Sequence, residues 1–300
     1  MAAITGEIAV PRTASRRRSS GLHIDRLLMY GLAILLVLLL VWPFFWAVSS
    51  SLKDVSEITT RPPKWLPAVP QWSNYIDIWR QVPLGRFVSN SLIVTVLAMI
   101  GQVASCTAVA YGFARFRFPG RDVLFGLALA TLLLPREVTI IPQYLMFRQV
   151  GWLDTLLPLI VPYWFAGGGG AFTIFLMRQF FMTIPHEYDE AAQMDGASSW
   201  WIFWRVLLPL AMPALATALI FAFLAHWNDF WGPLIFLNST DNYTLPLGLR
   251  WFQTSPADLG RPKDNLLLAA AVVATLPIIV LYFAAQKYFV RGIVMTGIKG

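Results

Sequence analysis

The chain has 300 residues, of which 57 % are apolar and 13 % charged, and its mean hydropathy is +0.60. Soluble domains are about 45–50 % apolar and about 25 % charged, so this composition excludes a soluble protein and indicates one that lies in a lipid bilayer. The single cysteine excludes a disulfide scaffold, and we ascribe the net charge of +7 to anionic lipid headgroups and topology, with no nucleic-acid partner.

Apolar stretches long enough to cross a bilayer follow a polar tail at residues 1–26. A hydrocarbon core about 30 Å thick requires about 20 helical residues. The sequence therefore predicts an all-α integral membrane protein with six transmembrane helices, at residues 27–48, 87–114, 123–147, 155–177, 206–228 and 266–285. The third stretch is the only one with charged residues, Arg136 and Glu137. An even number of spans places both termini on one side, but the distribution of Lys and Arg supports an orientation only weakly.

Residues 49–86 form the longest polar connection in the first half of the chain. Four prolines within residues 61–70 predict an extended strap, because proline disrupts a helix. We expect Ser73 to cap a short helix after the strap. The apolar side chains of this helix suit the outer membrane boundary, although simple packing is the default interpretation.

The spans contain few groups that could perform chemistry. The three histidines are dispersed, no nucleophile or metal motif is present, and Asp229 is expected at the wet boundary of the fifth span. A membrane-embedded enzyme acting on lipid or glycan is therefore a weak alternative. Uncharged polar and aromatic side chains instead fit a path for a polar, neutral solute, although many of them serve helix packing. The candidate path residues are Asn90, Thr95, Tyr163, Trp164 and Asn228.

The most informative segment is the polar loop at residues 183–209, between the fourth and fifth spans. Thr183 is a candidate helix cap, acidic residues suit the first helical turn, and Gly196 is a helix stop, so we predict a short helix from Pro185 to Asp195. The loop combines Glu190-Ala191-Ala192, three residues, Gly196, nine residues and Val206-Leu207-Leu208-Pro209. This spacing resembles the EAA loop of ABC importer permeases, EAA-x3-G-x9-I-x-L-P, with Val206 in place of isoleucine.

Further segments are similar to the sugar-importing, MalG-like branch of that family. They include Asn90-Ser91-Leu92, the run from Ala110 to Phe116, Phe118-Pro119-Gly120-Arg121, Trp227-Asn228-Asp229-Phe230 and the C-terminal Gly297-Ile298-Lys299-Gly300. The resemblance implies a type I ABC importer permease fold, with the transmembrane permease domain at residues 87–286 and the EAA loop in the cytoplasm. It also implies three partners: a second permease subunit, an ABC ATPase dimer and an extracytoplasmic solute-binding protein.

The family resemblance also assigns roles to individual residues. ATPase docking falls to Glu190, Ala191, Ala192, Asp195, Gly196 and Pro209, and Gly297, Lys299 and Gly300 of the cytoplasmic tail at residues 287–300 are expected to contact the ATPase. The chain itself would bind no cofactor, because ATP and Mg²⁺ belong to the partner ATPase. The expected cargo is a sugar, with glycerol phosphate or another polyol as the alternative. A passive scaffold or channel subunit, which would need no ATPase, is the remaining rival.

Overall fold

The computed structural model describes residues 22–250, 252 and 263–296, and all regular elements in these ranges are helical. Four segments are long and apolar enough to cross a membrane, and two bent helix pairs bring the number to six if each pair is one span. The all-α membrane class predicted from the sequence is therefore confirmed.

The first span is helix α1, Leu22–Ser51, which is longer at both ends than the predicted 27–48. Most of it lies in a unit of its own, residues 1–47, and residues 48–300 form a second unit. Residues 26–45 of this helix are exposed on all sides, whereas Ser49, Ser50 and Ser51 at its end are buried. Because the exposed side chains are almost all apolar, lipid is the environment that suits them.

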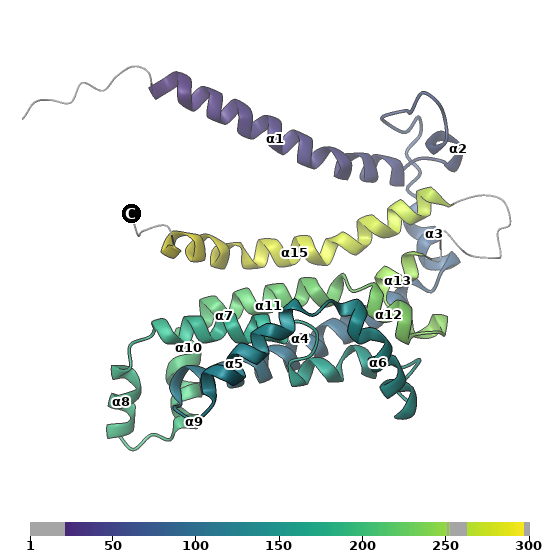
Figure 1. Cartoon of the computed structure of the whole chain (residues 1–300). Helices are drawn as coiled ribbons and strands as arrows, with labels where there is room; N and C mark the ends of the chain where they lie inside the picture. The colour runs from purple at the N-terminus through teal and green to yellow at the C-terminus, as the bar shows by residue number, and fades with distance from the viewer. Residues whose placement is uncertain (1–21, 251, 253–262, 297–300) are drawn as a thin grey trace, which may run out of the picture. The chain divides into compact units, whose positions relative to one another are not determined.

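Helix α4, Leu84–Arg115, is the central element of the second unit (Figure 1). It contacts α7 (Gly170–Thr183), α11 (Met212–Trp227) and the short helix η3 (Val161–Phe165). The side chains of Cys106, Met177 and Phe181 are completely buried where these helices meet. The long predicted span at 87–114 is thus the scaffold on which the others pack.

Two predicted spans are broken helices. The third consists of α5 (Arg121–Ala130), η1 (Thr131–Leu133) and α6 (Arg136–Gln149), with a bend of 98° between its halves. Pro135, immediately before α6, has no N–H to continue the first half. The fifth consists of α9 (Ser199–Ile202), the π-helical turn η4 (Phe203–Leu207) and α10 (Leu208–Leu210), which meet α11 at 81°. The prediction of continuous helices at 123–147 and 206–228 was therefore wrong.

The fourth and sixth spans also differ from the predicted ranges. The fourth begins with the 3₁₀ turns η2 (Leu157–Leu159) and η3, and α7 starts only at Gly170, because prolines and a glycine run precede it. The sixth is α15, Asp264–Thr296, which continues beyond the predicted end at residue 285. Short helices α12 (Trp231–Phe236), η5 (Thr240–Asn242) and α13 (Leu245–Leu249) lie between α11 and α15 in the chain.

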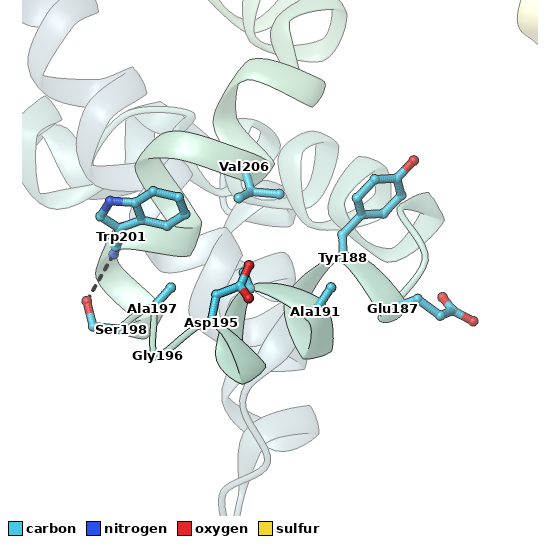
Figure 2. A pocket seen from close by; sticks show the side chains of 10 residues that line it. Glu187, Tyr188, Ala191, Asp195, Gly196, Ala197, Ser198, Trp201 and Val206 are labelled. Carbon is cyan, nitrogen blue, oxygen red and sulfur yellow. Dashed lines mark hydrogen bonds between the residues drawn. The ribbon is translucent and has the colours of Figure 1, made fainter.

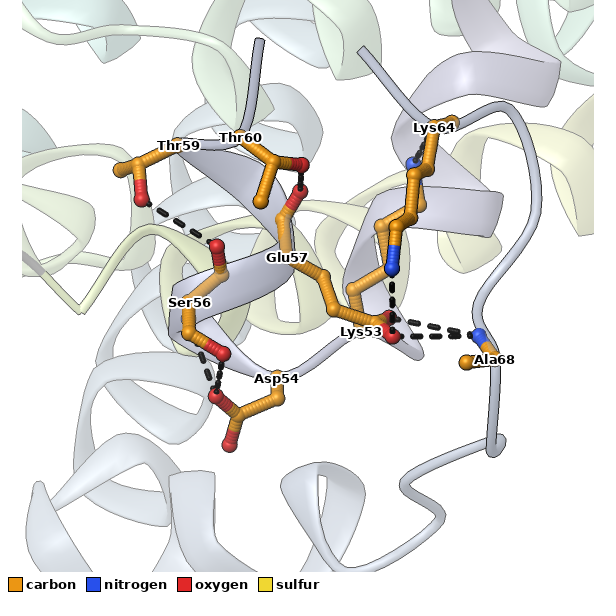
Figure 3. Close-up of polar contacts among 8 residues, drawn as sticks. All are labelled: Lys53, Asp54, Ser56, Glu57, Thr59, Thr60, Lys64 and Ala68. Carbon is orange, nitrogen blue, oxygen red and sulfur yellow. Dashed lines mark hydrogen bonds and ion pairs between the residues drawn. The ribbon is translucent and has the colours of Figure 1, made fainter. Parts of the chain in front are cut away.

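The strap between the first two spans is non-helical over residues 61–70, as predicted, and is flanked by α2 (Val55–Ile58) and α3 (Asn74–Gln81). Figure 3 shows the Glu57 carboxylate accepting a hydrogen bond from the Ala68 backbone N–H at 3.3 Å and lying 3.9 Å from the Lys64 ammonium. The Lys53 ammonium donates to the Lys64 carbonyl at 2.7 Å. These contacts hold the strap against the turn that follows α1.

Helix α3 packs on α15 rather than lying only along the membrane boundary. Ile78 and Val82 are buried in a cluster that includes Leu266 and Ala269 of α15, whereas Trp79 stays half exposed. The default packing interpretation therefore describes α3 better. Ser73 precedes the helix but makes no side-chain cap, so the predicted capping bond was wrong.

Asp154 joins the loop after α6 to the segment around η5. Its carboxylate accepts backbone hydrogen bonds from Asn238 at 2.9 Å and Ser239 at 2.8 Å, and Asn242 donates to its carbonyl. Although desolvation opposes the shift, hydrogen bonds to the carboxylate from the Ser239 hydroxyl, from the two backbone N–H groups and from the Asn242 amide lower the pKa of Asp154 to about 2. Since a lowered folded-state pKa stabilises above the unfolded value, this contribution is present above pH ~4 and lost as the pH falls toward 2.

Gly101 of α4 is required for close packing. A Cβ atom there would lie 1.9 Å from the Trp164 indole, which packs over this position and donates its N–H to the Leu97 carbonyl at 2.9 Å. The absence of a side chain on one helix thus permits a hydrogen bond from a neighbouring element.

We predict that Gly101→Ala displaces Trp164 and costs about 1–3 kcal/mol of stability, as other overpacked sites do. Gly112→Ala is the matched control in the same helix, because a Cβ atom there meets nothing within 4 Å. Thermal unfolding midpoints of the two purified variants check this. Equal midpoints would contradict the packing argument.

Candidate functional site

Helix α8, Glu187–Met194, lies in the predicted acidic loop between α7 and α9 (Figure 1). Three acids in its first turn complement the positive end of the helix dipole. Gly196 has a φ of +82°, the left-handed conformation expected at a helix stop. The predicted helix is therefore confirmed, one or two residues shorter at each end. Thr183 is not its cap, because this hydroxyl donates to the Phe180 carbonyl of α7.

A cavity of about 890 Å³ lies beside α8, and Figure 2 shows the residues around it. Small residues of α8 and the following turn, Ala191, Ala192 and Gly196, form part of its wall, and Trp201 of α9 forms another part. Ser198 accepts a hydrogen bond from the Trp201 backbone N–H at 3.2 Å and so caps α9. The cavity is wide enough to accept a segment of a partner protein.

The structure brings most of the predicted docking residues together. Ala191, Ala192, Asp195 and Gly196 line the cavity, and Glu190 is an exposed residue of the same helix that does not line it. Pro209 lies on α10 and does not line this cavity.

The contact that anchors α8 involves two residues that sequence reasoning missed. The Arg115 guanidinium at the end of α4 lies 3.2 Å from the Asp189 carboxylate, with side chains 4 % and 11 % exposed. Arg115 also donates to the Ile184 carbonyl at 3.0 Å. Arg115 belongs to the run from Ala110 to Phe116, and Asp189 lies in the EAA loop. Nothing in the spacing of these two segments shows that they are in contact.

Nearby contacts extend this junction. The Tyr111 hydroxyl of α4 donates to the Ser199 carbonyl of α9 at 2.9 Å, and Ala192 packs against the buried cluster that contains Phe203. The short helices α8 and α9 are therefore fastened to the same end of α4. A force applied to α8 would act directly on the central helix of the bundle.

The structure gives each of the predicted solute-path residues a different environment. Asn90 donates to the carbonyls of Asp241 and Tyr243, Trp164 donates to Leu97, and Asn228 donates to Leu224. Thr95 is completely buried. Tyr163 is the member of the set that lines a cavity, one of about 480 Å³ beside the broken third span.

Asp229 is not the wet boundary residue that the sequence predicted. Its carboxylate forms a bidentate pair with the Arg136 guanidinium, at 2.9 and 3.1 Å, and its side chain is 11 % exposed. Helix α11 begins only at Met212, so its 16 residues rise about 24 Å, less than an unbroken span would. The partner Arg136 comes from the break in the third span, a contact that no local pattern reveals.

A second polar contact lies close by. His226 shares a hydrogen bond of 2.8 Å with the Gln102 side-chain oxygen, and the Tyr163 ring meets the His226 ring edge-on at 4.3 Å. Among the residues that the structure describes, no three His, Cys, Asp or Glu side chains are grouped as a metal site. The predicted tail contacts Gly297, Lys299 and Gly300 lie outside the described residues.

Comparison with known proteins gives one family and a set of permeases. Residues 103–295 match the family "binding-protein-dependent transport system inner membrane component". The chain is 34 % identical over 270 residues to the probable ABC transporter permease YurM of Bacillus subtilis, covering 89 % of this chain and 86 % of that protein. It is 34 % identical over 261 residues to the diacetylchitobiose uptake permease NgcG of Streptomyces coelicolor, covering 86 % of this chain and 84 % of that protein.

A third relative is the sn-glycerol-3-phosphate transport permease UgpE of Yersinia pestis, 31 % identical over 265 residues, with 86 % of this chain and 92 % of that protein covered. The fold is similar to that of a bacterial ABC transporter involved in alginate import, with a TM-score of 0.78 at 24 % identity over 92 % of this chain and 100 % of that one. The chain therefore belongs to the inner-membrane components of binding-protein-dependent transport systems, the permeases of ABC transporters.

Proposed function

We propose that this chain forms half of the translocation pathway of an ATP-driven importer for a sugar or sugar-like solute. The observation that carries the proposal is α8, an exposed acidic helix beside a cavity, anchored to the central helix by a buried ion pair. Relatives named for the uptake of diacetylchitobiose and of sn-glycerol-3-phosphate support the solute class and keep glycerol phosphate as the alternative.

The permease family supports the same three partners that the sequence implied. A second permease subunit would complete the pathway, a solute-binding protein would deliver the cargo, and an ABC ATPase dimer would hold ATP and Mg²⁺. The EAA loop would face the cytoplasm of a bacterial cell. Because six spans are an even number, both termini would then lie on that side of the cytoplasmic membrane.

Two features of α8 and the turn after it support docking on the ATPase: exposed carboxylates and small residues. Glu190 and Asp195 are exposed carboxylates, and Ala191 and Gly196 leave room for close approach of another backbone. Glu190 would pair with a basic group of the ATPase, while a protruding part of the ATPase would fill the cavity. Neither ATP nor metal would contact this chain.

Transmission of movement rests on the Arg115–Asp189 pair. A buried ion pair holds its two charges in a fixed geometry, because separating them would leave each charge desolvated and unpaired. Movement of α8 during ATP binding would therefore pull the end of α4 with it. Since α4 contacts α7 and α11, the movement would reach the helices around the solute path.

We predict that Arg115→Ala and Asp189→Ala each cost about 3–5 kcal/mol, while the double variant costs no more than either single change, because the two charges act as one pair. Thermal unfolding of the assembled importer and its coupled ATP hydrolysis are the measurements. Arg121→Ala, which breaks a pair with the exposed Asp122, is the control and should be nearly neutral. Additive losses in the double variant would contradict coupling through this pair.

We predict that Glu190→Ala leaves membrane insertion intact but weakens docking by about 2–5 kcal/mol, the cost of removing one partner of a paired interfacial charge. Solute-stimulated ATP hydrolysis and transport in proteoliposomes measure the loss. Asp122→Ala removes an exposed carboxylate from another loop and serves as the control. Normal transport by Glu190→Ala would reject the docking role.

We predict that deletion of residues 292–300, which removes Gly297, Lys299 and Gly300, reduces ATPase coupling without preventing assembly. The reason is the family resemblance of this tail to segments that reach the ATPase dimer. Uptake and ATP hydrolysis by the truncated importer test the prediction. Wild-type uptake would rule out a tail contact that matters for coupling.

A further inference from the structure

A second cavity lies on the membrane-spanning part of the chain, away from α8. It has a volume of about 480 Å³, within the range of cavities that hold small molecules. Its walls come from η1 and the start of α6, from η2 and η3, and from the glycine run before α7. The polar groups that line it include Arg136, Thr139, Gln143 and Tyr163.

Two spans are interrupted where they border this cavity. The third bends by 98° between Leu133 and Arg136, and the fourth passes through 3₁₀ turns and the left-handed Ala166, Gly168 and Gly169 before α7 begins. Non-helical backbone at membrane depth is tolerated only where protein buries it or where it lines a water-filled cavity. In secondary transporters, helices interrupted within the membrane form the site where solute binds, and the two interruptions here border one cavity in the same way.

The charge in the cavity wall is already neutralised. Arg136 is the charged residue among the described lining residues, and Asp229 accepts hydrogen bonds from both of its terminal nitrogens. Arg136 stands at the N-terminal end of α6, where the helix dipole disfavours a cation, so Asp229 offsets that cost too. A Cβ atom at Gly232 would lie 2.5 Å from the Asp229 carboxylate and 2.9 Å from the guanidinium, so the pair fits tightly against this backbone.

This arrangement treats anionic and neutral solutes differently. A phosphate or carboxylate entering the cavity would lose water and meet no uncompensated cation, and Glu137, the next residue in α6, adds a further negative charge nearby. A neutral solute with several hydroxyls meets no such cost. The Arg136 side chain is 46 % exposed, so the N–H groups not used by Asp229 can reach hydroxyl oxygens.

The other polar groups suit hydroxyls as well. The Thr139 hydroxyl donates to the Arg136 carbonyl, so its oxygen lone pairs can accept a hydrogen bond from the solute. Gln143 supplies both an amide donor and a carbonyl acceptor, and Tyr163 supplies an aromatic ring that the contact with His226 holds in place.

We infer that this cavity is a binding site for a neutral, polyhydroxylated solute of about the size of a disaccharide, and that the Arg136–Asp229 pair excludes anionic cargo. The inference rests on the proposed importer function and narrows its solute class, because it disfavours glycerol phosphate. It assigns solute contacts to Arg136, Thr139 and Gln143.

The test uses the assembled importer with a single reactive thiol, introduced as Thr139→Cys in a Cys106→Ala background. The rate at which a small neutral thiol reagent modifies the thiol is measured with and without added solute. The solutes are three neutral disaccharides (maltose, cellobiose and N,N′-diacetylchitobiose) and one anion, glycerol 3-phosphate. At least one disaccharide should slow modification severalfold, and glycerol 3-phosphate should not.

A further variant, Asp229→Asn, should let glycerol 3-phosphate protect the thiol, because this change leaves the charge of Arg136 uncompensated.

Asp122→Cys, exposed in another loop, is the control, and no solute should change its rate of modification. Protection by glycerol 3-phosphate in the variant that keeps Asp229, or protection by none of the solutes, would overturn the assignment. ATP hydrolysis by the same complexes separates this failure from failure of the proposed function. Normal coupling of ATP hydrolysis without protection of the thiol rejects only the solute site in the cavity. Transport that does not depend on an ATPase rejects the importer function itself.

Discussion

One buried interaction fixes the position of α8, the ion pair between Arg115 at the end of α4 and Asp189 in α8. An eight-residue helix is too short to be stable by itself in water, so its position must come from tertiary contacts. The pair supplies one that is costly to break, because removal of either charge leaves the other buried and unpaired. It also leaves Glu190, the next residue along, on the exposed side. One helix therefore has a buried anchoring acid and, at the next position, an exposed acid that is available for the proposed docking.

The same principle appears a second time at the interrupted spans. Arg136 lies at the break in the third span and Asp229 lies just after α11, and each charge would be costly there without the other. The two pairs differ in exposure. The side chain of Arg115 is 4 % exposed and serves as a fixed joint, whereas that of Arg136 is 46 % exposed beside a cavity. The same kind of Arg–Asp ion pair therefore fixes two helices where it is buried and, in our proposal, contacts solute where solvent reaches it.

The sequence was sufficient for the class of protein and for the site that contacts the ATPase in the proposal. Long apolar stretches predict spans because the thickness of the bilayer sets their length, and the helix that ends at Gly196 is encoded locally by acids and glycine. The breaks were missed because apolar content does not distinguish a continuous helix from two bent halves, although Pro135 and Pro213 were visible signals. Asp229 and Arg115 could not be interpreted from local sequence, since each is explained by a partner more than 70 residues away.

The central claim is that α8 and the end of α4 move as one body when the ATPase binds ATP. Spin labels at Gln193 of α8 and Val109 of α4, both exposed, report the distance between these helices in the assembled importer. The account predicts the same distance distribution in the nucleotide-free and ATP-trapped states, and a broader distribution once Arg115 is replaced by alanine. A distance that changes between the two states in the otherwise native chain would contradict it.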